Sequence, residues 1–148
     1  MSKPATELSF GESVRVVLVA TGRSKDPDEN LPPLPQVEEN VRQLRRVLQD
    51  PDVVGLESDS VVPIVNEPEA SAIASKIAQA AHEARDTLIV YYAGHGLRGN
   101  QEEPLYLCSA NTKYENRKFS GVPVSSVRKA IADSPAPKRI LILDCCFA

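Results

Sequence analysis

The sequence predicts a three-layer α/β/α sandwich around a mostly parallel sheet. Strand-like apolar runs alternate along the chain with segments whose apolar residues recur at helical spacing. Two of these runs end in reactive residues, because His95 follows the run that ends at Tyr92 and Cys145 and Cys146 follow the run that ends near Leu143. Functional residues collect at the carboxyl ends of parallel strands, so the pattern predicts one site shared by two neighbouring strands.

The first half of the chain predicts two strands and a helix. Residues 14–20 are almost continuously apolar, as in a strand that is buried on both faces. Residues 23–35 are rich in Asp and Pro and predict a loop. Apolar residues at helical spacing between 34 and 48 predict a helix. The run 60–65 predicts a second strand, and Pro63 places it at an edge of the sheet.

A helix and a third strand follow. Residues 66–69 are typical of a helix start, with Asn66 as the capping side chain and Pro68 in the first turn. The alanine-rich segment 70–84 has a buried stripe at helical spacing, and residues 87–92 form an apolar strand-like run. These features predict a helix that leads directly into the strand before His95.

The last third is less regular. Residues 97–121 are polar, and the short apolar piece at 105–108 predicts a small hairpin. Apolar residues between 124 and 131 predict a short helix, and residues 138–143 predict the fourth strand of the main sheet. We expect no internal repeat and no low-complexity segment.

Length and composition limit the class of protein. We expect one domain over residues 1–148, with residues 1–13 as a flexible tail. The net charge is -3 without a basic cluster, so we expect no nucleic-acid partner. No run reaches the roughly 18 apolar residues of a membrane span and the N-terminus lacks an apolar signal core, so we expect a cytoplasmic protein with no membrane partner.

The cysteines indicate neither a disulfide framework nor a metal site. The chain has three, and two of them are adjacent, which makes a bridge between neighbours geometrically strained. No Cys-x-x-Cys pair or His-x-x-x-His pair is present. We therefore expect no metal and no cofactor.

A histidine and a cysteine at matching strand ends predict nucleophilic catalysis. A thiol becomes a nucleophile when a base takes its proton, and an imidazole is the usual base. The amide of Gly96 and the amide of the nucleophilic cysteine would together form an oxyanion hole. The residues alone leave Cys145 and Cys146 open as the nucleophile. The structural alternative is that each cysteine is a small core residue.

Simpler roles are predicted for the remaining candidates. We expect His82 on the surface of its helix and Cys108 packed beside a short strand. Tyr91 and Tyr92 are expected to face opposite layers of the sheet. The acidic run 26–30 lacks the full ligand spacing of a calcium loop, so we interpret it as a solvated loop.

The motifs Tyr-Tyr-Ala-Gly-His-Gly at 91–96 and Leu-Asp-Cys-Cys-Phe-Ala at 143–148 resemble those of caspase-like cysteine peptidases, closest to the bacterial, metacaspase-type branch. The resemblance covers nearly the whole chain, and the spacing of about 50 residues between His and Cys also matches the family. The Gln-Ala-Cys signature of animal caspases is absent. The resemblance implies a caspase-like fold, and its Asp-x-Cys pattern makes Cys146 the nucleophile and His95 the base.

The resemblance also implies a substrate preference. In metacaspase-like enzymes the acid two residues before the nucleophile lines the primary specificity pocket, and Asp144 holds that place here. A buried carboxylate selects Arg or Lys, because an unpaired buried charge is costly. A second pocket acid of that pattern corresponds to Asn40, with Glu39 as a neighbouring substitute. Animal caspases use an arginine near the first helix to bind substrate aspartate. At the matching place this chain has Leu34-Pro35-Gln36, which contains no arginine, so we expect no Asp specificity. The alternative for Asp144 is a strand-end hydrogen-bonding role.

The resemblance implies that this sequence is a large-subunit-like portion in which the small-subunit-like part is absent. The apolar run 139–143 would otherwise be an edge strand with unpaired amides. We expect a protein or peptide substrate, and a small-subunit-like segment or further domains of the same protein as partners. The function implied is a cysteine endopeptidase that cuts after Arg or Lys. The alternative is a catalytically weak or inactive caspase-like scaffold or signalling module.

Overall fold

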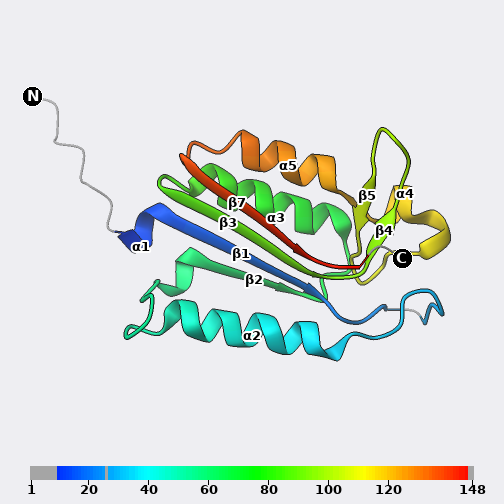
Figure 1. Cartoon of the computed structure of the whole chain (residues 1–148), viewed down its shortest axis with the longest axis horizontal. Helices are drawn as coiled ribbons and strands as arrows, with labels where there is room; N and C mark the ends of the chain where they lie inside the picture. The colour runs from blue at the N-terminus through cyan, green and yellow to red at the C-terminus, as the bar shows by residue number, and fades with distance from the viewer. Residues whose placement is uncertain (1–9, 26, 147–148) are drawn as a thin grey trace, which may run out of the picture.

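A four-stranded parallel sheet forms the centre of the molecule (Figure 1). The computed structural model describes residues 10–25 and 27–146. The strands lie in the order β2-β1-β3-β7. Their bounds are Val14–Thr21 for β1, Val61–Val65 for β2, Thr87–Gly94 for β3 and Lys138–Asp144 for β7. All pairs within this sheet are parallel, as the alternation of strands and helices predicted.

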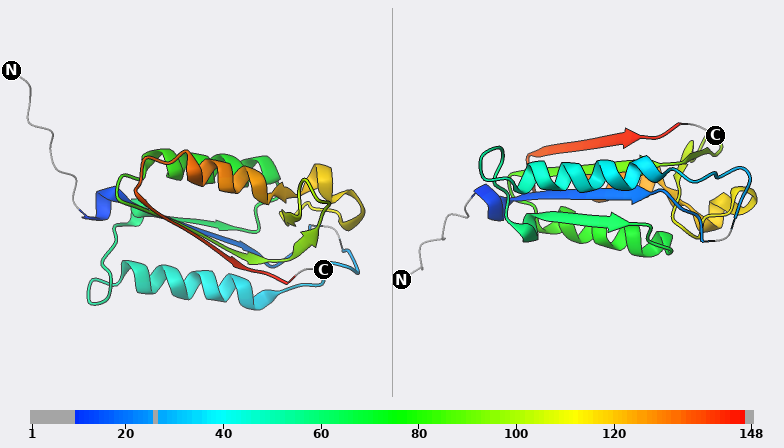
Figure 2. Two further views of the ribbon diagram at one scale, coloured as in Figure 1. Left: turned by 45° about the horizontal axis from the view of Figure 1, so that its top comes forward. Right: turned by 90° about the horizontal axis from the view of Figure 1, so that it is seen from below.

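Helices cover both faces of the sheet. Helix α2 (Pro35–Gln49) lies on one face, and α3 (Ala70–Glu83) and α5 (Val124–Ala132) lie together on the other (Figures 1 and 2). This arrangement confirms the predicted three-layer sandwich. Helices α3 and α5 face the sheet with the apolar stripe that their sequence spacing predicted. Helix α2 faces the sheet through Val37, Val41 and Leu48, whereas Leu44 of its predicted stripe is 38% exposed.

The core divides into two clusters because side chains alternate across a strand. In β1, Val17 and Val19 belong to the cluster beneath α3 and α5, whereas Val16 and Leu18 belong to the cluster beneath α2. All four side chains are at most 2% exposed. Burying a side chain of this size contributes about 1.5–3 kcal/mol, so β1 supplies a large share of the stability.

The two edge strands differ in exposure. Strand β2 pairs only with β1 in this sheet, and the missing amide of Pro63 is tolerated at that edge, as predicted. Strand β7 forms the opposite edge, where Ile140 is 46% exposed and Ile142 is 45% exposed. The face of β7 that these two residues share is therefore an open apolar surface.

The start of α3 differs from the prediction. The N-cap is Glu69, without a side-chain capping bond, and Pro68 precedes the helix instead of lying in its first turn. Asn66 adopts a left-handed backbone with φ of 50°, and its Oδ1 accepts hydrogen bonds from the amides of Gly22 and Arg23. Asn tolerates this conformation better than most residues, so its side chain is free to bind the end of β1.

A small antiparallel sheet lies beyond the ends of the main strands and confirms the predicted hairpin (Figure 1). Its order is β4-β5-β6. The bounds are Gly96–Arg98 for β4, Leu105–Leu107 for β5 and Val122–Pro123 for β6. Short helical turns at Ser58–Ser60, Tyr114–Asn116 and α4 (Arg117–Ser120) complete the connections.

The N-terminal segment departs from the expected tail at its end. Residues 10–13 form one helical turn, α1 (Phe10–Ser13), that leads directly into β1. The Ser13 carbonyl accepts hydrogen bonds from the amides of Arg85 and Asp86, which ties this turn to the start of β3. Residues 1–9 of the expected tail lie outside the described residues.

Candidate active site

The structure brings the two predicted strand ends together. Strands β3 and β7 are neighbours, with Ala93 opposite Asp144 in the last pair of the register. Beyond that pair the Gly96 amide donates a 3.2 Å hydrogen bond to the Cys146 carbonyl. The segments that carry His95 and Cys146 therefore continue side by side past the ends of their strands.

The two adjacent cysteines face opposite layers. Leu143 and Cys145 pack against the cluster beneath α3 and α5, whereas Tyr91 packs against the cluster beneath α2. Side chains alternate along a strand, and the same alternation continued past the strand ends at Gly94 and Asp144 would carry His95 and Cys146 to the side of Tyr91. We infer that Cys146, rather than Cys145, shares a face with His95.

The environments of the two thiols differ accordingly. Cys145 is partly buried and Cys146 is exposed. Burial, followed by the nearby Cys146 and Asp144, raises the pKa of the Cys145 thiol above its ordinary value. A nucleophilic cysteine needs the thiolate, so these conditions make Cys145 the poorer candidate.

A backbone carbonyl holds the imidazole of His95. The Nε2 atom lies 2.7 Å from the carbonyl oxygen of Pro32. A carbonyl oxygen can only accept, so Nε2 carries the proton and Nδ1 is the basic nitrogen of the neutral ring. Sequence reasoning missed this contact, because a main-chain oxygen within a loop leaves no residue-type signal.

The loop that carries Pro32 is tied to the ends of the strands. The Leu34 amide donates to the Gly22 carbonyl at 2.7 Å, and the Lys25 amide donates to the Ala110 carbonyl at 2.7 Å. A Cβ atom at Gly22 would lie 2.6 Å from the Leu34 carbonyl, so this close crossing requires glycine. These contacts hold the Pro32 carbonyl where it meets His95.

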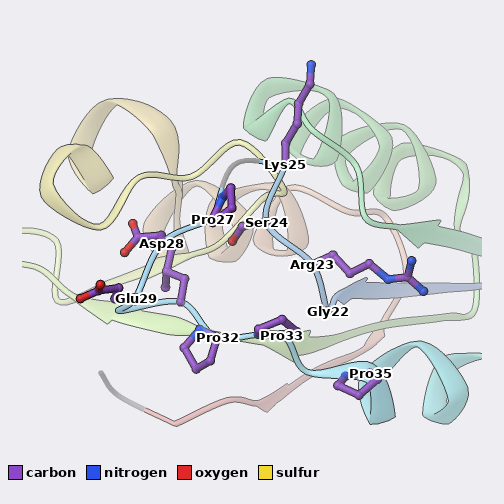
Figure 3. Close-up of a pocket in the computed structure, with 11 residues that line it drawn as sticks. Gly22, Arg23, Ser24, Lys25, Pro27, Asp28, Glu29, Pro32, Pro33 and Pro35 are labelled. Carbon is purple, nitrogen blue, oxygen red and sulfur yellow. The ribbon is translucent and has the colours of Figure 1, made fainter.

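The same loop lines a cavity of about 800 Å³ (Figure 3). Two acidic side chains, Asp28 and Glu29, lie together at the far turn of the loop, away from Arg23 near its start (Figure 3). The walls are Gly22, Arg23, Ser24, Lys25, Pro27, Asp28, Glu29, Leu31, Pro32, Pro33 and Pro35. Pro32 both lines this cavity and contacts the imidazole, so the cavity adjoins the candidate site.

Asp144 lies next to Tyr91 across the strands. The Tyr91 hydroxyl donates a 2.9 Å hydrogen bond to Oδ2 of Asp144. Burial, reinforced by the Asp144 carboxylate, raises the pKa of Tyr91 to about 12. Asp144 is exposed, so the buried carboxylate that was expected to select a basic residue is not found at this position. Among the residues that the structure describes, no hydrogen bond to the second oxygen of Asp144 is found.

The acids at the start of α2 occupy other positions than expected. Glu39 bonds Arg42 and Gln43 along the surface of the helix, and Asn40 is exposed. Glu38 instead points towards the strand ends, where a Cβ atom at Gly22 would lie 3.2 Å from its Oε1. A hydrogen bond with Asn66 and then one with Arg23 lower the pKa of Glu38. The Glu38 side chain is 15% exposed.

The Gly96 amide is occupied in this structure. It donates to the Cys146 carbonyl at 3.2 Å, so it can bind an oxyanion only after that bond opens. The absence of a Cβ atom at Gly96 matters for a second reason, because such an atom would lie 3.0 Å from Cys145 Sγ and 3.0 Å from Leu105 Cδ1. Gly96 therefore permits the close approach of the strand ends.

The residues assigned to simpler roles lie where they were predicted. His82 is exposed, Cys108 is buried directly after β5, and Tyr92 and Tyr91 face opposite layers. Burial raises the pKa of Cys108 to about 12. Over residues 10–25 and 27–146, no three His, Cys, Asp or Glu side chains form a group that would hold a metal.

A comparison with protein families identifies the family to which the chain belongs. The family model described as the caspase domain, from a peptidase family, matches residues 22–148. The chain belongs to the caspase-domain peptidase family. Membership supports a thiol peptidase of the hydrolase class, and the parallel sheet with helices on both faces agrees with a caspase-like fold. No curated protein matches the sequence closely enough to be reported as a relative. Within the part of this caspase domain that the structure describes, no helix is long and apolar enough to cross a bilayer.

Proposed function

We propose that this caspase domain is a cysteine endopeptidase of the metacaspase-like branch, with Cys146 as nucleophile and His95 as base. The observation that carries the proposal is the pairing of β3 with β7, which aligns the Gly-His-Gly and Cys-Cys segments. The exposed Cys146 thiol and the fixed tautomer of His95 support it. The cytoplasmic location stays a prediction, with which the three free cysteines agree.

In the proposed mechanism the Cys146 thiol gives its proton to Nδ1 of His95, and the sulfur bonds to the substrate carbonyl carbon. The Pro32 carbonyl accepts from Nε2–H and so stabilises the imidazolium that forms. The amides of Gly96 and Cys146 bind the developing oxyanion. The carbon–nitrogen bond then breaks, His95 protonates the leaving amine, and water hydrolyses the thioester.

The proposed substrates are proteins or peptides cut after Arg or Lys. The second oxygen of Asp144 is suited to a guanidinium or ammonium group, because a charge-assisted hydrogen bond is stronger than a neutral one. Glu38 takes the place that sequence reasoning gave to Asn40 or Glu39 as a second acid near the strand ends. Its bond to Arg23 must open before it contacts a substrate.

We also propose that a small-subunit-like segment, or another domain of the same protein, pairs with β7. This strand is an edge of the sheet, and Ile140 and Ile142 are 46% and 45% exposed. An added strand would satisfy the free backbone groups of the edge and cover these side chains. Neither nucleic acid nor membrane is a proposed partner.

The alternative is a caspase-like scaffold or signalling module with little or no activity. The observation that favours it is the hydrogen bond from Gly96 to the Cys146 carbonyl, which occupies a proposed oxyanion donor. The exposure of Asp144 also weakens the proposed selection of a basic residue.

Hydrolysis of a fluorogenic peptide that ends in Arg separates these readings. Cys146→Ala should abolish hydrolysis, and Cys145→Ala should retain most of it because that thiol faces the core. An Asp-ended peptide serves as the specificity control. Activity that survives in Cys146→Ala but is lost in Cys145→Ala would reverse the assignment, and cleavage after Asp alone would remove the role of Asp144.

A further inference from the structure

A fully buried tyrosine lies directly behind the proposed base. The Tyr92 side chain is 1% exposed, and its hydroxyl donates to the His95 carbonyl at 2.8 Å. The Cys108 amide donates to this hydroxyl at 2.9 Å, and the Cys108 carbonyl lies 3.0 Å away. A phenol has one proton and donates to one carbonyl at a time, and the shorter contact is the one to His95.

The surrounding residues hold this hydroxyl in place. A Cβ atom at Gly94 would lie 2.6 Å from the Tyr92 oxygen and 2.9 Å from the Thr21 carbonyl, so no larger residue fits there. The Cys108 amide also reaches the His95 carbonyl directly, at 3.2 Å. Burial raises the pKa of Tyr92 well above its ordinary value, so the hydroxyl keeps its proton and stays a donor.

The His95 carbonyl and the Gly96 amide belong to the same peptide unit. That unit is planar and trans, so its oxygen and its N–H point in opposite directions. A donor that fixes the oxygen on the Tyr92 side therefore directs the N–H towards Cys146, where its hydrogen bond is found. The same unit carries the Cα atom from which the His95 side chain projects to Pro32.

We propose that Tyr92 is a positioning residue, whose hydroxyl orients the peptide unit between His95 and Gly96 and thereby both the base and one oxyanion donor. This inference rests on the proposed function, and it identifies the hydrogen bond that fixes the orientation of the proposed base and oxyanion donor. Tyr92 does not touch the substrate, because its side chain is 1% exposed and belongs to the core cluster beneath α3 and α5.

The test uses Tyr92→Phe, which removes one oxygen and keeps the ring in the core. The chain has only two histidines, so the imidazole signals of His95 can be followed by NMR in the whole chain, with the exposed His82 as internal reference. We expect Tyr92→Phe to speed exchange of the His95 Nε2 proton and to shift the imidazole signals of His95 from their positions in the unaltered chain, while those of His82 stay in place. Tyr106→Phe is the matched control, because Tyr106 is also a buried tyrosine and no hydrogen bond joins it to His95 among the described residues.

Kinetics with the Arg-ended peptide give the second readout. Tyr92→Phe should lower kcat by roughly 10- to 100-fold with little change in KM, because misplacement of a base and a donor affects the transition state most. Tyr106→Phe should leave kcat unchanged. A purely structural role would instead lower the melting temperature and leave the His95 signals and kcat of the folded protein as in the unaltered chain.

The outcomes separate the two proposals. If the unaltered chain shows no Cys146-dependent hydrolysis, the proposed function fails, while the NMR result still decides whether Tyr92 orients His95. Unchanged His95 signals, or unchanged kcat in an active chain, would overturn the role of Tyr92. If Tyr92→Phe does not fold, the test is made by NMR on the unaltered chain. The Tyr92 hydroxyl proton should then exchange slowly with solvent and lie close to the Cys108 amide proton. Rapid exchange of the hydroxyl proton would contradict the inference.

Discussion

Tyr91 and Asp144 are joined by a 2.9 Å hydrogen bond across β3 and β7, from the phenol to one carboxylate oxygen. The bond depends on the register of the two strands, which places Ala93 rather than Tyr91 opposite Asp144. Because the pKa of Tyr91 is raised to about 12, the phenol remains a donor throughout the pH range in which a peptidase is assayed. The bond therefore orients Asp144 without adding a pH dependence of its own.

Asp144→Asn should lower kcat/KM for an Arg-ended peptide by about 10- to 100-fold, since a hydrogen bond to a charged group contributes about 1.5–3 kcal/mol. Tyr91→Phe should raise KM by only about fivefold, because it frees the carboxylate to rotate but keeps its charge. Steady-state kinetics on both variants checks this order. A larger effect of Tyr91→Phe than of Asp144→Asn would contradict the proposed role of the carboxylate.

The three thiols should react with iodoacetamide in a fixed order. Cys146 is exposed, Cys145 is partly buried with a raised pKa, and Cys108 is buried with a pKa of about 12. The thiolate is the reacting species, so we expect Cys146 first, then Cys145, then Cys108. Mass spectrometry of digested samples after timed labelling measures the order. If Cys146 reacts no faster than free cysteine, its thiol is not activated, and the result would favour the scaffold function over the proposed peptidase function.

Asn66 is predicted to stabilise the loop that holds Pro32. Asn66→Ala removes an acceptor shared by the amides of Gly22 and Arg23 and puts alanine, which tolerates the left-handed region less well than asparagine, at φ of 50°, so it should cost about 2 kcal/mol of unfolding free energy. Asn66→Gly loses the same acceptor but accepts the left-handed backbone, and should cost less. Urea unfolding of both variants separates the two contributions. Equal losses would mean that the backbone conformation contributes nothing.

Alkaline pH should destabilise the protein through Cys108. Its ordinary pKa is 9.0 and its folded pKa is about 12, so between these values the folded chain keeps a proton that the unfolded chain releases. Stability is therefore complete below pH 9 and falls as pH rises towards 12, by at most about 1.4 kcal/mol per pH unit. Urea unfolding at pH 8 and pH 10 measures the fall, and Cys108→Ala should reduce it. Cys146→Ala is the control. If it reduced the loss of stability between pH 8 and pH 10 as much as Cys108→Ala does, the role given to Cys108 would be wrong.

The sequence predicted the features that depend on local pattern. Apolar periodicity predicted the strands and helices, and Pro63 predicted an edge strand. The meeting of His95 with the cysteine pair required only the general rule that neighbouring parallel strands end at the same side. These predictions succeed because burial and backbone pairing dominate the choice of fold.

Other features depend on contacts between distant segments, and residue type does not report them. Asn66 has the side chain of a helix cap, yet the end of β1 competes successfully for its oxygen. Glu38 and Glu39 are identical residue types, and only the rotation of α2 about its axis decides that Glu38, rather than Glu39, points to the strand ends. The partner of His95 is a main-chain oxygen, for which any residue at position 32 would serve.

The adjacent cysteines at the end of β7 lie on opposite faces of the sheet, so the number of residues in β7 decides which thiol faces His95. Successive residues point to opposite layers, so a single-residue insertion within β7 that preserved the pairing at its start would move Cys145 to the place of Cys146 and turn Cys146 towards the core. Because two cysteines are adjacent, one thiol would still lie on the side of His95 after this shift. A single cysteine would instead turn towards the core. Asp144 would not share this protection, since the same slip would rotate its carboxylate away from Tyr91. The proposed nucleophile could thus be replaced after an insertion in β7, whereas the proposed specificity residue could not.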